Sequence, residues 1–141
     1  MHTQRPIPAT IAAVIRDGQV LLVRRANPPD QGRWAFPGGK IELGERIEDA
    51  AARGLFEEPG VPAEPLTVFD AVDVFDHDAD GLLRRHYILV AVLCRWLSGE
   101  PVAGDDASQA RWVPLAELDA QALALSFGVA VVARKAAALA G

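Results

Sequence analysis

Carboxylates gather in one short stretch of the chain, residues 38–61, which reads GGKIELGERIEDAAARGLFEEPGV. Glu57 and Glu58 are adjacent near the end of a predicted helix, where negative charge opposes the helix dipole and the two like charges repel each other. Paired carboxylates beside the backbone carbonyls of a glycine turn are hard oxygen ligands of the kind that Mg²⁺ prefers. The stretch therefore predicts a magnesium site. A solvated acidic helix face is the alternative interpretation of the helix taken alone.

The overall charge limits the kinds of ligand that this protein can bind. The chain has 141 residues, a formal net charge of −5 and a hydrophobic content of 50%, which excludes a natively disordered protein and predicts one globular domain. An acidic chain lacks the clustered lysines and arginines that grip a nucleic-acid backbone. If this protein handles phosphates, it needs a metal or a local device to do so.

The hydrophobic pattern predicts the elements that position the acidic stretch. A strand pair is expected over 9–26 around the turn Asp17-Gly18, and a longer one at 66–75 and 86–97 around Asp80-Gly81. Apolar residues at helical spacing predict a helix over 46–58. The remaining expectations are an irregular segment at 27–39 with a short strand at 34–36, a short strand at 110–113, a helix at 114–118 and a closing helix at 126–139. This order predicts a single α/β domain with a mixed sheet and helices packed against it.

The spacing of the charged residues resembles the signature of the Nudix hydrolase family. Gly39 is followed after five residues by Glu45 and after seven more by Arg53, and the stretch then continues with Leu55, Glu57, Glu58, Gly60 and Val61. Eight of the nine positions that the family pattern specifies match, and the preceding residues 34–38 also look like the family's usual lead-in. The resemblance implies a Nudix-type α/β/α sandwich with a mixed central sheet, a domain over 1–141 with its motif at 39–61. It is nearest to small bacterial members called ADP-ribose pyrophosphatases.

The ninth position departs from the pattern. Where the family has a glutamate that binds metal or activates water, this chain has Gly54, which does neither and lowers helix stability by about 1 kcal/mol relative to alanine. Pro59 is a second departure on the same segment, because proline cannot donate a backbone N–H. The departures leave two hypotheses open. One is a hydrolase with reduced or rerouted catalysis, and the other is an inactive nucleotide-binding or regulatory module.

The resemblance also implies roles for individual residues. Glu57 and Glu58 are expected to bind a divalent metal together with the Gly38 carbonyl, and Glu45 and Arg53 to form an ion pair that fixes the glycine loop against the helix. Further acids are implied at Glu42 and at Asp105 or Asp106, with Asp106 as the preferred metal ligand and a plain turn as the alternative.

The function implied is Mg²⁺-dependent (or Mn²⁺-dependent) hydrolysis of the diphosphate linkage in nucleoside diphosphate derivatives, either ADP-ribose-like compounds or nucleoside triphosphates. The substrate is expected to contact Arg25, Arg33 and Phe75, and the alternative interpretation of the arginines is that they are ordinary surface charges. Trp34 and Tyr87 fit a core better than a base-stacking platform.

Other features bound the partners and the compartment. The lone Cys94 lies in an apolar run and is expected to act as a small buried hydrophobe rather than a reactive thiol. The chain shows no signal-peptide segment and no apolar run long enough to span a bilayer, so a cytoplasmic protein without membrane or nucleic-acid partners is expected. Nudix proteins frequently form dimers, so the resemblance allows a homodimer.

Overall fold

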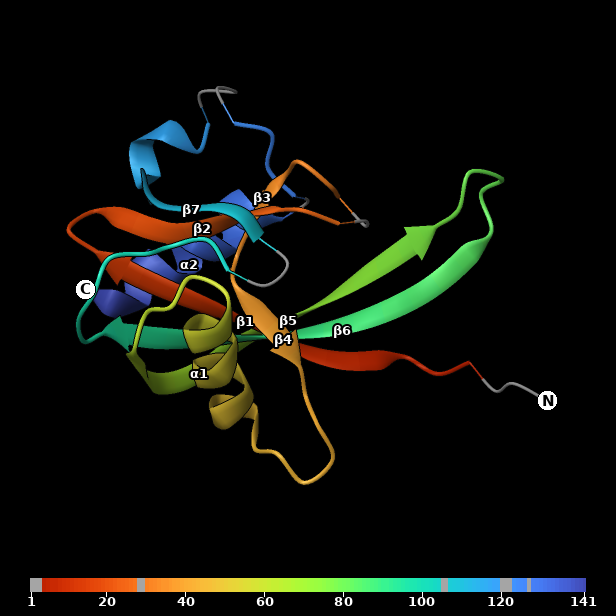
Figure 1. Ribbon diagram of the computed structural model, residues 1–141, viewed down its shortest axis with the longest axis horizontal. Helices are drawn as coiled ribbons and strands as arrows, with labels where there is room; N and C mark the ends of the chain where they lie inside the picture. Colours follow the sequence, from red (N-terminus) through yellow and green to blue (C-terminus); the bar gives the residue numbers. More distant parts are fainter. Residues whose placement is uncertain (1–3, 28–29, 105–106, 120–122, 127) are drawn as a thin grey trace.

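The chain begins with the first expected strand pair, shown in the computed structural model of Figure 1. The structure describes residues 4–27, 30–104, 107–119, 123–126 and 128–141. Strand β1 (Ile7–Arg16) turns into β2 (Gln19–Arg25) through Asp17 and Gly18, whose φ angles are 50° and 73°. Two successive positive φ angles are what a two-residue type I′ turn requires, so the predicted hairpin is confirmed.

The sheet is mixed, as the sequence predicts. Its other strands are β3 (Trp34–Ala35), β4 (Gly38–Lys40), β5 (Ala63–His77), β6 (Leu83–Trp96) and β7 (Ala107–Pro114). The main path runs β3-β2-β1-β6-β5, with β4 paired to β1 and β7 paired to β2. Among the pairings between these strands, the β1–β6 pair is parallel and the others are antiparallel; it runs from Ile7 opposite Tyr87 to Val14 opposite Cys94. The ends of β5 and β6 that meet at residues 78–82 form a projecting arm, which extends away from both helices (Figure 1).

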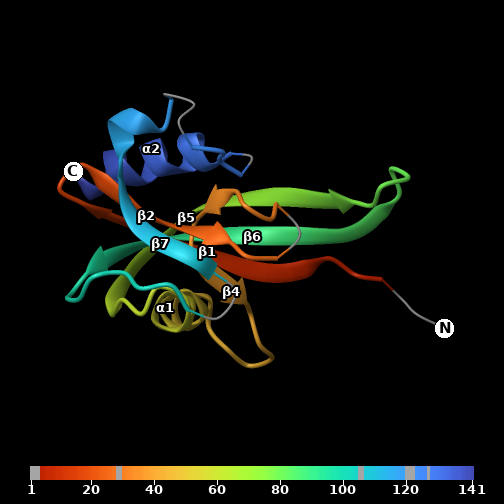
Figure 2. The ribbon, with the colours of Figure 1, turned by 45° about the horizontal axis from the view of Figure 1, so that its top comes forward.

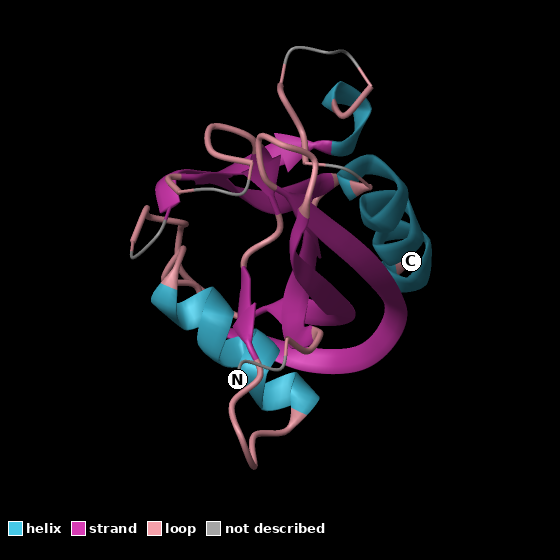
Figure 3. Cartoon of the chain, turned by 90° about the vertical axis from the view of Figure 1, so that its right-hand side faces the viewer, coloured by secondary structure: helices cyan, strands magenta, loops and turns pink. Residues whose placement is uncertain are grey.

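Two helices cover opposite faces of the sheet. Helix α1 (Ile47–Glu57) lies on one face and α2 (Val129–Ala140) on the other (Figure 2). Side chains alternate between the faces of a strand, so Ala13 of β1 packs in the core on the α2 side, while Ala12 and Val14 pack with α1. The curved sheet between these two layers is seen edge-on in Figure 3. The α/β/α sandwich expected from the resemblance is confirmed.

Several boundaries differ from the sequence expectations. The helix expected at 114–118 is a three-residue 3₁₀ turn, η1 (Leu115–Glu117), because Pro114 still belongs to β7. The closing helix starts at Val129 instead of 126, after Gly128 with its positive φ of 82°. The end of segment 27–39 is not irregular, because Gly38 and Gly39 belong to β4 and pair with Ile11 and Thr10 of β1. In the described part of the chain, no helix has the length and apolar character needed to cross a bilayer.

Candidate metal-binding and active site

Strand β4 places the glycine loop directly on β1. A Cβ atom built on Gly38 would lie 1.9 Å from the Thr10 carbonyl oxygen, which is far closer than any side chain tolerates. The Thr10 hydroxyl, almost fully buried, donates a hydrogen bond of 3.2 Å to the Gly39 carbonyl from the same side. Glycine is therefore required at position 38 so that the loop can reach the sheet. The close approach also makes the loop a rigid neighbour for α1.

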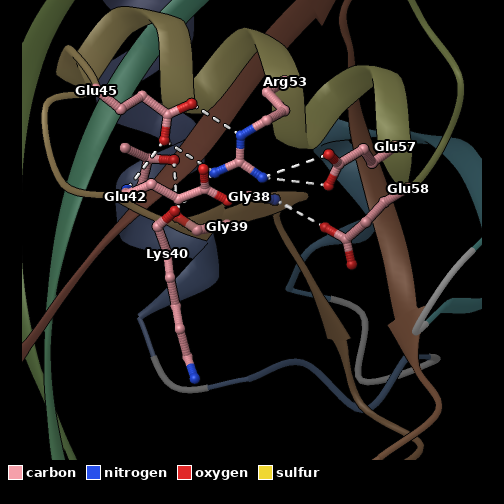
Figure 4. Close-up of polar contacts among 9 residues, drawn as sticks. Gly38, Gly39, Lys40, Glu42, Glu45, Arg53, Glu57 and Glu58 are labelled. Atoms are coloured by element: carbon pink, nitrogen blue, oxygen red, sulfur yellow. Dashed lines mark hydrogen bonds and ion pairs between the residues drawn. The ribbon is translucent and has the colours of Figure 1, made fainter.

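The end of α1 is attached to this loop through Glu58. The Gly38 N–H donates a hydrogen bond of 2.9 Å to Oε1 of Glu58, as Figure 4 shows. Helix α1 ends at Glu57, and Pro59 follows it in a buried position where its carbonyl accepts the Val102 N–H at 2.8 Å. Pro59 therefore does not interrupt the helix. The Glu58 carboxylate therefore lies against the backbone of the glycine loop.

Arg53 holds the acidic side chains in place beside the glycine loop. Its guanidinium makes a two-point ion pair with Glu45, with distances of 2.8 and 3.0 Å, and also contacts the Glu57 carboxylate at 3.2 Å. Its Nη2, which also donates to Glu45, donates to the Lys40 carbonyl at 2.7 Å, which ties the helix to the loop (Figure 4). The hydrogen bond from Arg53 lowers the pKa of Glu45, and the Glu42 backbone N–H lowers it further. The Glu45–Arg53 ion pair implied by the resemblance is present.

The oxygen atoms here suit a divalent cation that keeps part of its water shell. Glu57 is half exposed and Glu58 is half buried, and both sit at the helix C-terminus, whose partial negative charge favours a cation. Within the described residues, no three His, Cys, Asp or Glu side chains converge into a complete metal cage. Mg²⁺ commonly takes one or two carboxylates and fills its other positions with water and substrate phosphate, so the two glutamates and the Gly38 carbonyl fit such an ion.

A second feature, a hollow of about 380 Å³, opens over β2, β3 and β7. It is lined by Arg24, Gly32, Trp34, Gln109, Arg111, Leu123 and Ala124. The volume lies within the range of small-molecule sites. The Arg111 guanidinium lies 4.9 Å from the centre of the Trp34 ring, and Nε of Arg24 donates to the Gly32 carbonyl. Neither arginine forms an ion pair with a carboxylate of the described residues.

Sequence reasoning missed the hollow because it depends on a strand pairing. Residues Gln109 and Arg111 come into place when β7 pairs with β2, with Arg24 opposite Gln109. They lie some 85 residues beyond β2 in the chain. Alternation along β7 was a usable signal, since Gln109 and Arg111 are two residues apart and so share a face.

The other candidate residues occupy different surroundings. Arg33 is exposed and donates to the Leu125 carbonyl at 3.0 Å, and Arg25 is half buried at the end of β2. Phe75 lies on the projecting arm, exposed, with its ring stacked on His86 at 4.6 Å. Asp105 and Asp106 lie outside the described residues. Gly104, just before them, lies against the backbone of α1's end, since its Cβ position is 2.9 Å from the Glu58 carbonyl oxygen.

Two expectations about the core are confirmed. Cys94 is buried at 2% exposure, and burial raises the pKa of its thiol to about 12. Trp34 is buried in the core on the α2 side. Tyr87 is half buried on β6.

Comparison with known proteins identifies the family of this chain. Residues 6–134 match the family described as NUDIX domain. The chain belongs to the Nudix family. Its Nudix fold is shared with the crystal structure of the MutT Nudix hydrolase from Burkholderia pseudomallei, with 30% identity, a TM-score of 0.79 and coverage of 93% of this chain and 98% of that one.

Other Nudix relatives differ in the compounds that their names give. The ADP-ribose pyrophosphatase of Methanocaldococcus jannaschii is 33% identical over 113 residues, which is 80% of this chain and 64% of that protein. The 8-oxo-dGTP diphosphatase of Escherichia coli is 31% identical over 105 residues, covering 74% of this chain and 76% of that protein. The chain thus matches less than two thirds of the length of the first of these relatives.

Proposed function

We propose that this Nudix domain is a divalent-metal-dependent hydrolase that cleaves the diphosphate linkage of nucleoside diphosphate derivatives, with Mg²⁺ or Mn²⁺ as the ion. The observation that carries the proposal is the hydrogen bond between Gly38 N–H and Glu58, which joins the carboxylate end of α1 to the glycine loop. It leaves Glu57, Glu58 and the Gly38 backbone close together within a family whose named relatives act on ADP-ribose and 8-oxo-dGTP.

In this proposal some residues hold the metal ion and others position the metal ligands. Glu57, Glu58 and the Gly38 carbonyl would hold the ion, with Asp106 as a further ligand that follows the segment lying against the helix end. When bound, the ion neutralises the diphosphate and lowers the pKa of the attacking water. Arg53 acts as a positioning residue, because it holds Glu45, Glu57 and the Lys40 carbonyl at once.

We propose that the hollow lined by Arg24, Gln109 and Arg111 receives the nucleoside end of the substrate. Trp34, at the hollow, is only four residues before Gly38, so the two are at most about 14 Å apart. The proposal requires one nucleotide to span both places. Guanidinium and amide groups donate to the oxygen and nitrogen acceptors of a base or of its sugar phosphate. Arg25 and Arg33 remain candidates for contacts with the phosphate chain. Phe75 lies on β5, at the opposite end of the sheet from β3, and remains a candidate only for contacts with a part of the substrate outside the hollow.

The test is a metal titration with product analysis. The protein is incubated with ADP-ribose, dinucleotides and nucleoside triphosphates while Mg²⁺ and Mn²⁺ are varied, and the phosphate-bearing products are separated by chromatography. We expect turnover that requires the metal and yields two phosphate-bearing fragments. Turnover unaffected by a chelator, or no cleavage of any compound of these classes, would overturn the proposal.

One observation favours a second candidate, a nucleotide-binding module without turnover. Gly54 supplies no carboxylate, and the Gly38 backbone occupies the space into which a side chain at position 54 would extend. Calorimetry separates the two candidates. The binding module predicts nucleotide affinity with no product formed, and measurable turnover removes it.

A further inference from the structure

Gly54 marks the closest approach of α1 to the glycine loop. It is buried in the helix, and a Cβ atom built on it would lie 2.7 Å from the Gly38 carbonyl carbon and 2.9 Å from both the Gly38 Cα and its carbonyl oxygen. These are backbone atoms, and they belong to a strand held from the other side by Thr10. The loop therefore has no space to move away from the helix, because Gly38 is paired with β1 and lies close against the Thr10 backbone.

The approach has a direct consequence for Glu58, which lies one helical turn after Gly54. The Glu58 N–H donates to the Gly54 carbonyl at 3.0 Å, and the Glu58 carboxylate accepts the Gly38 N–H at 2.9 Å. The three residues thus form one compact unit. Because Gly54 has no side chain, the helix lies close enough to the loop for the Gly38 N–H to donate to the Glu58 carboxylate.

We propose that Gly54 is a positioning residue, whose lack of a side chain lets α1 lie against Gly38 and so fixes Glu58 on the glycine loop. The catalytic consequence of this inference rests on the proposed function, whereas the contact between Gly54 and Gly38 does not depend on it. Gly54 is then more than a lost ligand. The site of this chain is built around the glycine, and restoring the glutamate of the family pattern lowers metal binding.

The size of the disturbance follows from the distances. Carbon atoms in contact lie about 3.5 Å apart or more, so a side chain at position 54 pushes the helix away from the loop by about 0.8 Å. A shift of that size along the same line lengthens the hydrogen bond between Gly38 and Glu58 to about 3.7 Å, beyond hydrogen-bond range. Misplacement of reacting groups by about 1 Å can cost about 100-fold in rate.

The experiment compares Gly54→Glu and Gly54→Ala with Ala51→Gly, a control on the same helix. Ala51 is fully buried in the core beneath α1, so its replacement destabilises the helix without adding a side chain at the loop. Three quantities are measured without any nucleotide: the melting temperature, the Mn²⁺ affinity by calorimetry, and the exchange rate of the Gly38 amide by NMR.

We expect Gly54→Glu and Gly54→Ala to weaken Mn²⁺ binding about 10-fold or more and to speed exchange of the Gly38 amide at least 10-fold. The control lowers the melting temperature and changes neither of the other two. Gly54→Ala carries the test if the glutamate variant does not fold, since a methyl group is the smallest side chain that reaches Gly38. Tighter Mn²⁺ binding by Gly54→Glu with a protected Gly38 amide would overturn the inference.

Failure of the proposed function looks different in this experiment. If the unsubstituted protein binds Mn²⁺ and protects its Gly38 amide but cleaves no nucleotide, the hydrolase proposal fails and the role of Gly54 stands. If it cleaves nucleotides, and Gly54→Glu cleaves them faster at equal Mn²⁺ affinity, the role of Gly54 fails and the hydrolase proposal stands.

Discussion

Replacing Glu58 with glutamine separates the structural from the chemical role of this side chain. Glutamine keeps an oxygen that accepts the Gly38 N–H, and it removes the negative charge. The backbone contact between the helix and the loop therefore survives in weaker form. If Glu58 binds the metal, activity falls much more than stability does.

The loss of stability is small. Hydrogen bonds to charged groups contribute about 1.5–3 kcal/mol and neutral ones about 0.5–1.5 kcal/mol, so Glu58→Gln costs about 1 kcal/mol. Part of this is recovered, because Glu58 follows the C-terminus of α1, where negative charge is unfavourable. For a domain of this size, we expect the melting temperature to fall by no more than about 3 °C.

The loss of activity is large. Removing a residue that only supports a metal ligand commonly lowers metal affinity or activity by about 10–100-fold. Removing a direct ligand is therefore expected to lower kcat/KM by about 100-fold or more. The assay measures kcat/KM with ADP-ribose at several Mg²⁺ concentrations, together with thermal unfolding. Glu48→Gln is the matched control, since Glu48 lies in the first turn of the same helix and pairs with Arg46. A Glu58→Gln protein with native kcat/KM and Mg²⁺ dependence would refute the metal-ligand assignment.

Four further changes have definite expected outcomes. Arg53→Met removes the contacts with Glu45, Glu57 and the Lys40 carbonyl, so we expect kcat to fall at least about 10-fold with a lower melting temperature, and Arg53→Lys to restore only part of it because lysine lacks the two-point geometry; full rescue by lysine would contradict this. The pKa of Glu45 is lowered in the folded protein from its ordinary 4.5, so the unfolded chain takes up the proton first as the pH falls, and stability is lost below about pH 4.5. Melting curves from pH 7 to pH 3 should show a smaller decline for Glu45→Gln. The pKa of the Cys94 thiol is raised to about 12, so the thiol should not react with a disulfide reagent at pH 8 until the protein is denatured; stability should fall above pH 9 as the unfolded chain ionises, and Cys94→Val should lack that part of the fall. Arg111→Ala should raise KM for nucleotides about 10-fold with kcat and melting temperature little changed, and an unchanged KM would remove the hollow as the nucleoside site.

The parts of this fold that follow local rules were predictable from the sequence. The turn Asp17-Gly18 and the helix before Pro59 depend on the preferences of a few neighbouring residues, and both are present within a few residues of their expected bounds. Strand β4 was missed because two glycines have no strand preference of their own. They form a strand only because Thr10 of β1 lies alongside, which is a contact across 29 positions of the chain.

The candidate site divides in the same way. Residues Glu45, Arg53, Glu57 and Glu58 were predictable because a fixed spacing on one helix and its leading loop brings them together. Gln109 and Arg111 were not, since they depend on how β7 pairs with β2. The meaning of Gly54 was also beyond the sequence. In the sequence Gly54 stands only for a missing carboxylate, whereas in the structure it is the point of contact between α1 and the loop.

Under the proposed function, these two halves of the site let a chain of net charge −5 hold an anionic substrate. At the end of α1 the surface is acidic, so a diphosphate is repelled there unless a cation intervenes. At the hollow the surface carries Arg24 and Arg111, and no carboxylate of the described residues pairs with either of them, so under the proposed function an acceptor group of the substrate would bind there without a metal. Under the proposed function, the acidic half decides whether the bound compound reacts, and the basic half decides which compound is held. A change of substrate is therefore expected from substitutions in β2 and β7, and a loss of reaction from substitutions in α1 and the glycine loop.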